Sequence, residues 1–165
     1  MGKPDAAGPA GCDLVIRLAV TSDITSIVRL LADDPLGAAR EIAPEDGAPP
    51  DAVYVNAFAA IEADPNARVI VACRADQIVG TLQLNLIAGL SRSGLFRGQI
   101  ESVRVAASER GTGLGTRLFD WAIAECRAAG CGLVQLTTDR TRTDAHRFYE
   151  RLGFEASHTG YKLKL

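Results

Sequence analysis

The sequence lacks a charge excess of either sign. Its 165 residues include 18 lysines and arginines and 20 aspartates and glutamates, which gives a net charge of −2 at pH 7. A chain with so little net charge has no overall basic field that would attract nucleic acid or an anionic membrane surface. It also lacks any run of about 18 apolar residues that could cross a bilayer. We therefore expect small molecules, and neither nucleic acid nor a membrane, as binding partners.

A targeting signal is also missing. Residues 1–13 are rich in glycine, alanine and proline and contain no hydrophobic signal core. We expect them to form a flexible N-terminal segment. Residues 14–165 are expected to form one domain, because a chain of this length can bury a single core. The expected location is cytoplasmic.

Residue patterns that bind a metal ion are missing too. The four cysteines are Cys12, Cys73, Cys126 and Cys131. They have no C-x-x-C spacing, and the only histidines are His146 and His158, so we expect no metal site. Cys73 falls in a predicted strand and Cys126 on the apolar side of a predicted helix, which suits small buried thiols. Neither histidine is obviously paired with a cysteine, which disfavours a cysteine nucleophile.

Hydrophobic periodicity predicts an alternation of strands and helices. Strands are expected over residues 14–19, 68–74, 77–88, 99–105 and 133–138, and at the C-terminus, where Tyr161, Leu163 and Leu165 alternate with lysines. Helices are expected after a cap at 21–23, over 51–63, from 115 to just before Gly130, and after a cap at Thr143 or Asp144. Residues 33–52 are predicted as loop. This order of elements is typical of an α/β domain with a mixed sheet.

A glycine-rich run separates the strand over 99–105 from the next helix. It reads Arg110-Gly111-Thr112-Gly113-Leu114-Gly115-Thr116. Its three glycines allow backbone conformations and close approaches that a Cβ would block. The helix that follows directs its unpaired first-turn amides and the positive end of its dipole into this run. The run therefore predicts an anion site made of the backbone amides of residues 111–116, beside the fixed charge of Arg110.

The spacing of the glycines narrows the choice of anion. A dinucleotide fingerprint would need glycine at Thr116 or Leu118, and the P-loop pattern G-x-x-x-x-G-K-[ST] occurs nowhere in the chain. A nucleotide-binding α/β protein is therefore disfavoured, although it stays open as an alternative. The remaining pattern, Arg110-x-x-Gly113-x-Gly115, resembles the R/Q-x-x-G-x-G/A loop with which the GNAT superfamily of acyl-CoA-dependent N-acetyltransferases binds the diphosphate of coenzyme A.

Two flanking segments extend the resemblance, which runs from about Ile16 to the C-terminus. Residues 99–105 look like the family's central fourth strand, with the acidic Glu101 near its middle, and residues 147–154 look like its closing helix, with Tyr149 before a Gly-Phe turn. The resemblance implies an α/β (α+β) fold in a single GNAT-type domain. Its sheet would be mixed, mostly antiparallel and of about seven strands, splayed between strands 4 and 5 and flanked by about four helices.

The resemblance also implies a set of roles. Acetyl-CoA would be the acyl donor, with its diphosphate on residues 110–116. The backbone of Val103 and Val105 would pair with the pantetheine arm where the strands splay apart, and a backbone N–H there would meet the thioester oxygen. Tyr149 would protonate the departing thiolate. The alternative for Tyr149 is an edge-packing aromatic ring with its hydroxyl in water.

Glu101 is the candidate general base. A carboxylate in a central strand is costly to bury without a partner, and desolvation would raise its pKa toward that of a useful base, acting directly or through water. A structural ion pair with Arg104 of the same strand is the alternative.

The acceptor site is less defined by the sequence. Six acidic residues and a single base, Arg40, lie between positions 33 and 51. A solvated acidic loop is the ordinary interpretation, and a cationic amine acceptor is the alternative. The function predicted from the whole sequence is transfer of acetyl from acetyl-CoA to a primary amine of a small molecule by direct attack in a ternary complex. A protein or peptide amine, or a non-catalytic acyl-CoA-binding module, are alternatives, and a homodimer is compatible with the resemblance.

Overall fold

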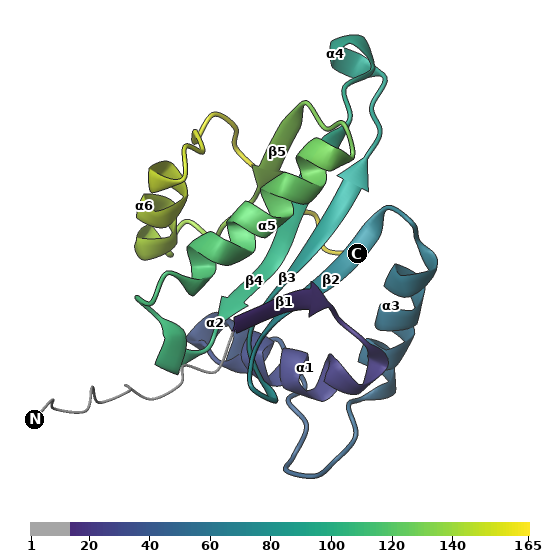
Figure 1. Cartoon of the computed structure of the whole chain (residues 1–165), viewed down its shortest axis with the longest axis vertical. Coiled ribbons are helices and arrows are strands. Elements are labelled where there is room, and N and C mark those ends of the chain that lie inside the picture. The colour runs from purple at the N-terminus through teal and green to yellow at the C-terminus, as the bar shows by residue number, and fades with distance from the viewer. Residues whose placement is uncertain (1–13) are drawn as a thin grey trace, which may run out of the picture.

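The computed structural model describes residues 14–165. The predictions for residues 1–13, including Cys12, lie outside the described residues. The described chain builds one sheet with strand order β1-β2-β3-β4-β5 (Figure 1). The strands are β1 (Leu14–Leu18), β2 (Ala67–Arg74), β3 (Gln77–Ile87), β4 (Arg97–Val105) and β5 (Leu133–Leu136). Neighbours from β1 to β4 are antiparallel, and β5 runs parallel to β4.

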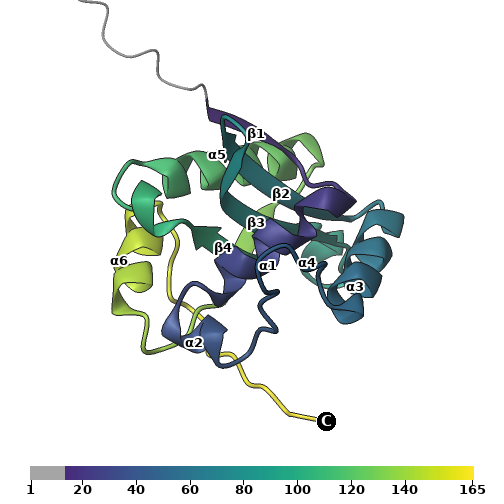
Figure 2. The same ribbon diagram turned by 90° about the horizontal axis from the view of Figure 1, so that it is seen from below.

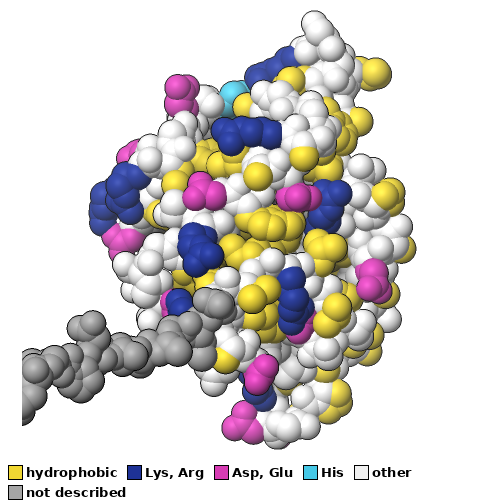
Figure 3. Space-filling view, viewed as in Figure 1, with side chains coloured by type: hydrophobic (Ala, Val, Ile, Leu, Met, Phe, Trp, Pro, Cys, Tyr) yellow, Lys and Arg dark blue, Asp and Glu magenta, His cyan; other side chains and the backbone are white. Residues whose placement is uncertain are grey.

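Helices cover both faces of this sheet. They are α1 (Ile24–Ala32), α2 (Pro35–Ala38), α3 (Ala52–Ala63), α4 (Ser91–Gly94), α5 (Leu114–Ala128) and α6 (Thr143–Arg151), with short 3₁₀ turns at Thr21–Asp23 and Ala107–Glu109. Seen from below, α5 lies on one side of the sheet and α1 and α3 lie on the other (Figure 2). Charged side chains of both signs are scattered over the face that carries α5 (Figure 3).

The alternation of side chains in β2 explains this layering. Ile70 and Ala72 belong to the core that α5 closes, whereas Val71 and Cys73 pack with Ile27 of α1. Successive strand residues point to opposite faces, so a strand that is apolar at consecutive positions must be covered on both. The α5 core combines Leu118 and Phe119 of α5 with strand residues that include Leu82, Leu84 and Ile100.

Several details differ from those that the sequence led us to expect. The described residues form five strands rather than about seven, and six helices rather than about four. The expected C-terminal strand is wrong, because Tyr161, Leu163 and Leu165 are exposed and lie outside any strand. Alternation makes a strand only where a sheet edge pairs with it, and nothing in the described residues pairs with this segment.

The extra helices are short and depend on local hydrogen bonds. Helix α2 lies in the segment predicted as loop, and the Asp34 side chain caps it by accepting from the amides of Leu36 and Gly37. Proline at the first helical position adds to this start signal. Helix α6 begins without the expected cap, since its N-cap is Arg142, whose side chain makes no capping bond.

A bulge divides β4 into two parts. Thr81 of β3 faces Arg104 and Gln83 faces Glu101, so Ser102 and Val103 together oppose a single residue of β3. Ser102 has φ 54°, a left-handed conformation that non-glycine residues rarely adopt. Pairing with β5 ends at Ile100 and Leu136, although β4 continues to Val105. Residues 101–105 therefore present an edge that β5 does not cover, which we call the open edge of β4.

A substitution at Gly98 of β4 tests how tightly α5 packs on the sheet. A Cβ at Gly98 would overlap the sulfur of Cys126 on α5, which is fully buried. We expect Gly98→Ala to lower the free energy of unfolding, measured by urea denaturation, by about 2 kcal/mol because the core is overpacked. Adding Cys126→Ala should recover part of that loss by removing the sulfur. Gly160→Ala, a control with open space around it, should change the stability by less than about 0.5 kcal/mol. Additive losses in the double variant would contradict this account of the packing.

Candidate active site

The glycine-rich loop ends in an uncapped helix. Gly113 is the N-cap of α5, with φ 87°, and no side chain makes a capping hydrogen bond there. The first-turn amides of Leu114, Gly115 and Thr116 are thus left to a ligand or solvent at the positive end of a 15-residue helix. A side chain at position 113 would be strained, so glycine is needed to hold this turn. This end of α5 has the geometry of an anion site.

Part of the predicted loop is used by the protein itself. The amide of Arg110 donates to the carbonyl of Ala107, and the amide of Thr112 donates to that of Glu109, both at 3.3 Å. The Thr112 hydroxyl also donates to the Glu109 carbonyl at 2.8 Å. The amides of residues 110 and 112 therefore help to shape the loop, and of the six amides predicted to bind an anion, that of Thr112 is bonded within the protein.

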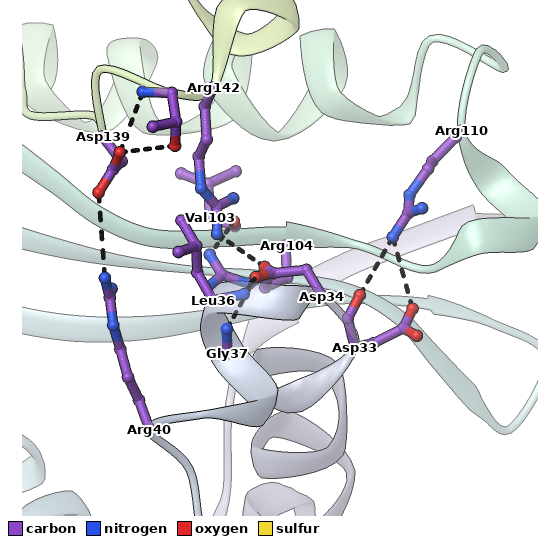
Figure 4. A network of polar contacts seen from close by, with 11 residues as sticks. Asp33, Asp34, Leu36, Gly37, Arg40, Val103, Arg104, Arg110, Asp139 and Arg142 are labelled. Atoms are coloured by element: carbon purple, nitrogen blue, oxygen red, sulfur yellow. Dashed lines mark hydrogen bonds and ion pairs between the residues drawn. The ribbon is translucent and has the colours of Figure 1, made fainter.

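Arg110 lies beside this loop in a weak ion pair. Its Nη2 is 3.5 Å from Asp33 Oδ2 and 3.3 Å from the Asp33 carbonyl oxygen (Figure 4). Both side chains are more than half exposed, at 59% and 53%. Exposed ion pairs contribute little to stability, so Arg110 can turn toward an anion at low cost.

The open edge of β4 lies between this loop and β5. Val103 and Val105 pack their side chains against the α5 core, which leaves their backbone at the edge that β5 does not cover. The carbonyl of Val103 accepts a hydrogen bond from Arg104 Nη1 at 2.9 Å. An extended ligand could add along this edge as a further strand, which is how exposed sheet edges bind peptide-like chains.

Glu101 does not have the environment that the sequence argument assumed. Its carboxylate is exposed and lies 3.5 Å from Asn85 Nδ2, so both the expected burial and the alternative ion pair with Arg104 are wrong. The strand is central, but Ile100 faces α5, and Glu101 therefore points to the opposite face. On that face α1 and α3 form apolar clusters with the sheet to which Glu101 does not belong, and its carboxylate stays open to solvent.

The bulge brings a second charged residue to the face of Glu101. Residues 81 and 83 of β3 share one face, and their partners across the ladder, Arg104 and Glu101, therefore share it as well. In a regular strand these two residues would point in opposite directions. An apolar cavity of about 140 Å³ between α1, α3 and the sheet reaches the bulge at Ser102.

Tyr149 of α6 lies in an aromatic cluster near the open edge. Its ring packs on Phe119, Phe148 and Phe154, with centroids 5.5 to 6.3 Å apart. Burial raises the pKa of Tyr149, and the positive charges of Arg142 and Arg104 oppose that rise. The phenol is therefore protonated at neutral pH and lies within the field of these two arginines. Such a group can donate a proton to a departing anion.

Sequence reasoning missed a cluster formed by Asp34, Arg104 and Arg142, which we call the Asp34 cluster (Figure 4). Asp34 Oδ2 accepts from Arg142 Nη2 at 2.8 Å and lies 3.1 Å from Arg104 Nε. Burial by itself raises the pKa of Asp34, but the Gly37 amide and the two arginines outweigh it and lower the pKa. The cap before Pro35 was visible in the sequence, whereas no local signal joins Asp34 to an arginine 108 residues away.

The other acidic residues before α3 are mostly bonded as well. Asp33 contacts Arg110, Glu41 accepts from the Tyr54 hydroxyl at 2.8 Å, Asp46 lies 3.0 Å from Arg29, and Asp51 caps α3. Arg40, the single base of this segment, lies 4.0 Å from Asp139 (Figure 4). Most of these acidic side chains thus make an ion pair, a hydrogen bond or a cap, while Asp33 and Asp46 remain exposed to solvent as the sequence predicted.

Three further observations concern metals, membranes and cysteine chemistry. Within residues 14–165, no group of three or more His, Cys, Asp or Glu side chains could hold a metal ion, and no helix has the length and apolar character to span a membrane. Burial raises the pKa of the Cys126 thiol to about 11, so it stays protonated at neutral pH. A buried neutral thiol is a poor nucleophile.

Comparisons with known proteins agree with this geometry. The sequence model of the Acetyltransferase (GNAT) family matches residues 26–154. The chain is 37% identical over 105 residues to the aminoalkylphosphonate N-acetyltransferase of Salmonella typhimurium, covering 64% of this chain and 68% of that protein. It is 36% identical over 89 residues to the glucosamine 6-phosphate N-acetyltransferase of Trypanosoma brucei brucei, covering 54% and 58%. A solved structure from Bacillus halodurans C-125, described as a transcriptional regulator, superposes with a TM-score of 0.87 at 45% identity, covering 93% of this chain and all of the other.

The Asp34 cluster predicts a difference between two consecutive aspartates. Asp34→Ala removes the α2 cap and leaves Arg104, whose side chain is only 19% exposed, without its counter-charge. We expect this variant to lose about 2 kcal/mol of unfolding free energy at pH 7. Asp33→Ala, the control, breaks only a surface pair and should lose less than about 0.5 kcal/mol.

The pH dependence follows from the lowered pKa of Asp34. A carboxyl whose folded pKa is depressed stabilises the fold above its unfolded pKa, and that contribution is lost as the pH falls through the folded value. Below about pH 4 the natural protein should therefore lose stability more steeply than Asp34→Ala. Parallel acid curves in urea denaturation would show that Asp34 is not stabilised by its charge.

Proposed function

The chain belongs to the acetyltransferase (GNAT) family and is an N-acetyltransferase. On this basis we propose its two substrates and the roles of its residues. The donor is acetyl-CoA, which this family uses. The acceptor is the primary amine of a small molecule, attacked directly in a ternary complex. Its two named relatives support a small acceptor, since one acts on aminoalkylphosphonates and the other on glucosamine 6-phosphate.

The observation that carries the proposal is the position of the donor elements. The uncapped start of α5, with its glycine turn, follows the strand whose open edge β5 leaves uncovered, after the 3₁₀ turn Ala107–Glu109. We assign the diphosphate of acetyl-CoA to the amides at the start of α5, with Arg110 turning from Asp33 to add a charge-assisted contact. The pantetheine arm adds to the backbone of Val103 and Val105 as an extra strand.

The chemical step uses groups on both sides of this edge. Glu101 accepts the proton of the attacking amine, directly or through a water molecule, and its exposed position leaves it accessible to an acceptor. The nitrogen forms a bond to the acetyl carbon, and a backbone N–H of the open edge stabilises the negative charge on the carbonyl oxygen. The carbon–sulfur bond then breaks, and Tyr149 donates its proton to the thiolate.

The two catalytic roles are tested by measuring coenzyme A release with a panel of amines. We expect Glu101→Gln and Tyr149→Phe each to lower kcat by about 100-fold or more, the effect of losing a general base or acid, with little change in the Kd for acetyl-CoA. Glu62→Gln and Tyr161→Phe make the same atomic changes at exposed positions and serve as controls. If acetyl-CoA binds tightly and every amine is inert, the chain is an acyl-CoA-binding module and the proposal is wrong.

The donor site is tested by thermal shift. Acetyl-CoA should raise the Tm and ATP should not, because a ligand stabilises the folded state according to its affinity. Arg110→Gln should weaken acetyl-CoA binding by about tenfold, the usual effect of removing one charge-assisted contact. Arg127→Gln, at the far end of α5, should bind as the natural protein does. Equal stabilisation by ATP and acetyl-CoA would favour a nucleotide site instead.

A further inference from the structure

We propose that the acceptor amine carries an acidic group, a phosphonate, phosphate or carboxylate, and that Arg104 and Arg142 bind this group. The inference rests on the proposed N-acetyltransferase function and names the class of its second substrate. It is supported by the composition of the Asp34 cluster, the use of its hydrogen bonds, and its position beside the proposed catalytic residues.

The cluster consists of two arginines and one aspartate, and the carboxylates of Glu41 and Asp139 act on these arginines from outside it. Two guanidiniums converge on one oxygen, with Arg142 Nη2 at 2.8 Å and Arg104 Nε at 3.1 Å from Asp34 Oδ2. The other carboxylate oxygen, Oδ1, accepts from the amides of Leu36 and Gly37. Asp34 is thus fixed from both sides and neutralises one of the two arginines. Arginines gathered in this way are the usual binding site for carboxylate and phosphate groups.

The hydrogen-bonding capacity of the cluster is also incompletely used. Each guanidinium has five N–H donors. Within residues 14–165 the hydrogen bonds of these two guanidiniums go to Asp34 and to the Val103 carbonyl. Arg104 Nε is buried and, despite its short distance to Asp34, has no hydrogen bond of acceptable geometry. An anion placed between the two arginines would supply acceptors for these unused donors.

The cluster lies where an acceptor must bind. The bulge sets Arg104 on the same face of the sheet as Glu101, and Arg104 also donates to the carbonyl of Val103 at the open edge. The charges of Arg104 and Arg142 both act on the Tyr149 phenol. An acid held by the two arginines would therefore place its amine, a few bonds away, near Glu101 and the thioester.

The surrounding charges disfavour a cationic acceptor. Asp34 is bonded to both arginines, and Glu41 accepts from the hydroxyl of Tyr54. The second ammonium group of a diamine would meet the guanidiniums of Arg104 and Arg142, which repel it. The structure thus favours the opposite of the cationic acceptor that the sequence left open.

The experiment compares four amines of equal chain length in the coenzyme A release assay. They are aminoethylphosphonate, β-alanine, propylamine and diaminopropane. We expect at least one of the two acids to exceed propylamine in kcat/KM by about tenfold or more, mainly through a lower KM, because the anion contacts act equally on bound substrate and transition state. Diaminopropane should be the poorest substrate. Preference for the phosphonate or for β-alanine identifies which acid the arginines accept.

Variants separate binding from a structural role. Arg142→Gln should reduce the preference for the acid over propylamine by about tenfold, and Arg142→Lys should restore part of it, because Lys keeps the charge without the bidentate fork. Arg127→Gln, with the same charge change, should keep the full preference. A merely structural role for Arg142 would lower kcat/KM for all amines by the same factor and leave the preference intact, which would overturn the inference.

Two outcomes distinguish this inference from the proposed function. If propylamine is acetylated as well as the acids, the inference is wrong and the N-acetyltransferase proposal stands. If no amine in this or the wider panel releases coenzyme A, the proposed function itself is wrong.

Discussion

The bulge at Ser102 is the constraint on which the site depends. A non-glycine residue with φ 54° costs about 1–3 kcal/mol and persists only where its surroundings impose it, as the ladder with β3 does on both sides of the bulge. The bulge brings Arg104 to the face of Glu101, and it lies just beyond the last residue of β4 that pairs with β5. A regular strand at this place would point Arg104 toward the α5 core.

Asp34 joins the parts of the chain that surround the bulge. It caps α2, and it contacts one arginine from β4 and another from the residue before α6. The helix that carries Tyr149 is thus tied to the strand that carries Glu101 through a single carboxylate. Phe148 links the same helix to α5, since it packs on Phe119 and lies beside Gly115 at the start of α5. The glycine-rich loop before α5, the open edge of β4 and helix α6 are therefore held together by few contacts.

The sequence predicted most of the regular elements and little of the site's detail. The stripe of α5, the hairpin of β2 and β3 around Ala75, and the buried Cys73 and Cys126 follow from local periodicity and turn signals, and the structure confirms them. The bulge has no such signal, because serine rarely adopts the left-handed backbone conformation that Ser102 has here. The Asp34 cluster depends on residues far apart in the chain. Glu101 was expected to be buried because its strand is central, but burial depends on which helices cover each face.

The close packing of Cys126 against Gly98 means that labelling of this thiol can report the separation of α5 from β4. The thiol lies sealed between α5 and β4 and is protonated at neutral pH, so a thiol reagent in solution meets it only when the helix separates from the strand. Its labelling rate then measures how often that separation occurs. The same helix begins at the glycine turn, so a molecule bound there would slow the labelling of Cys126 without touching its sulfur. The two places are about 12 residues apart on a helix that rises about 1.5 Å per residue.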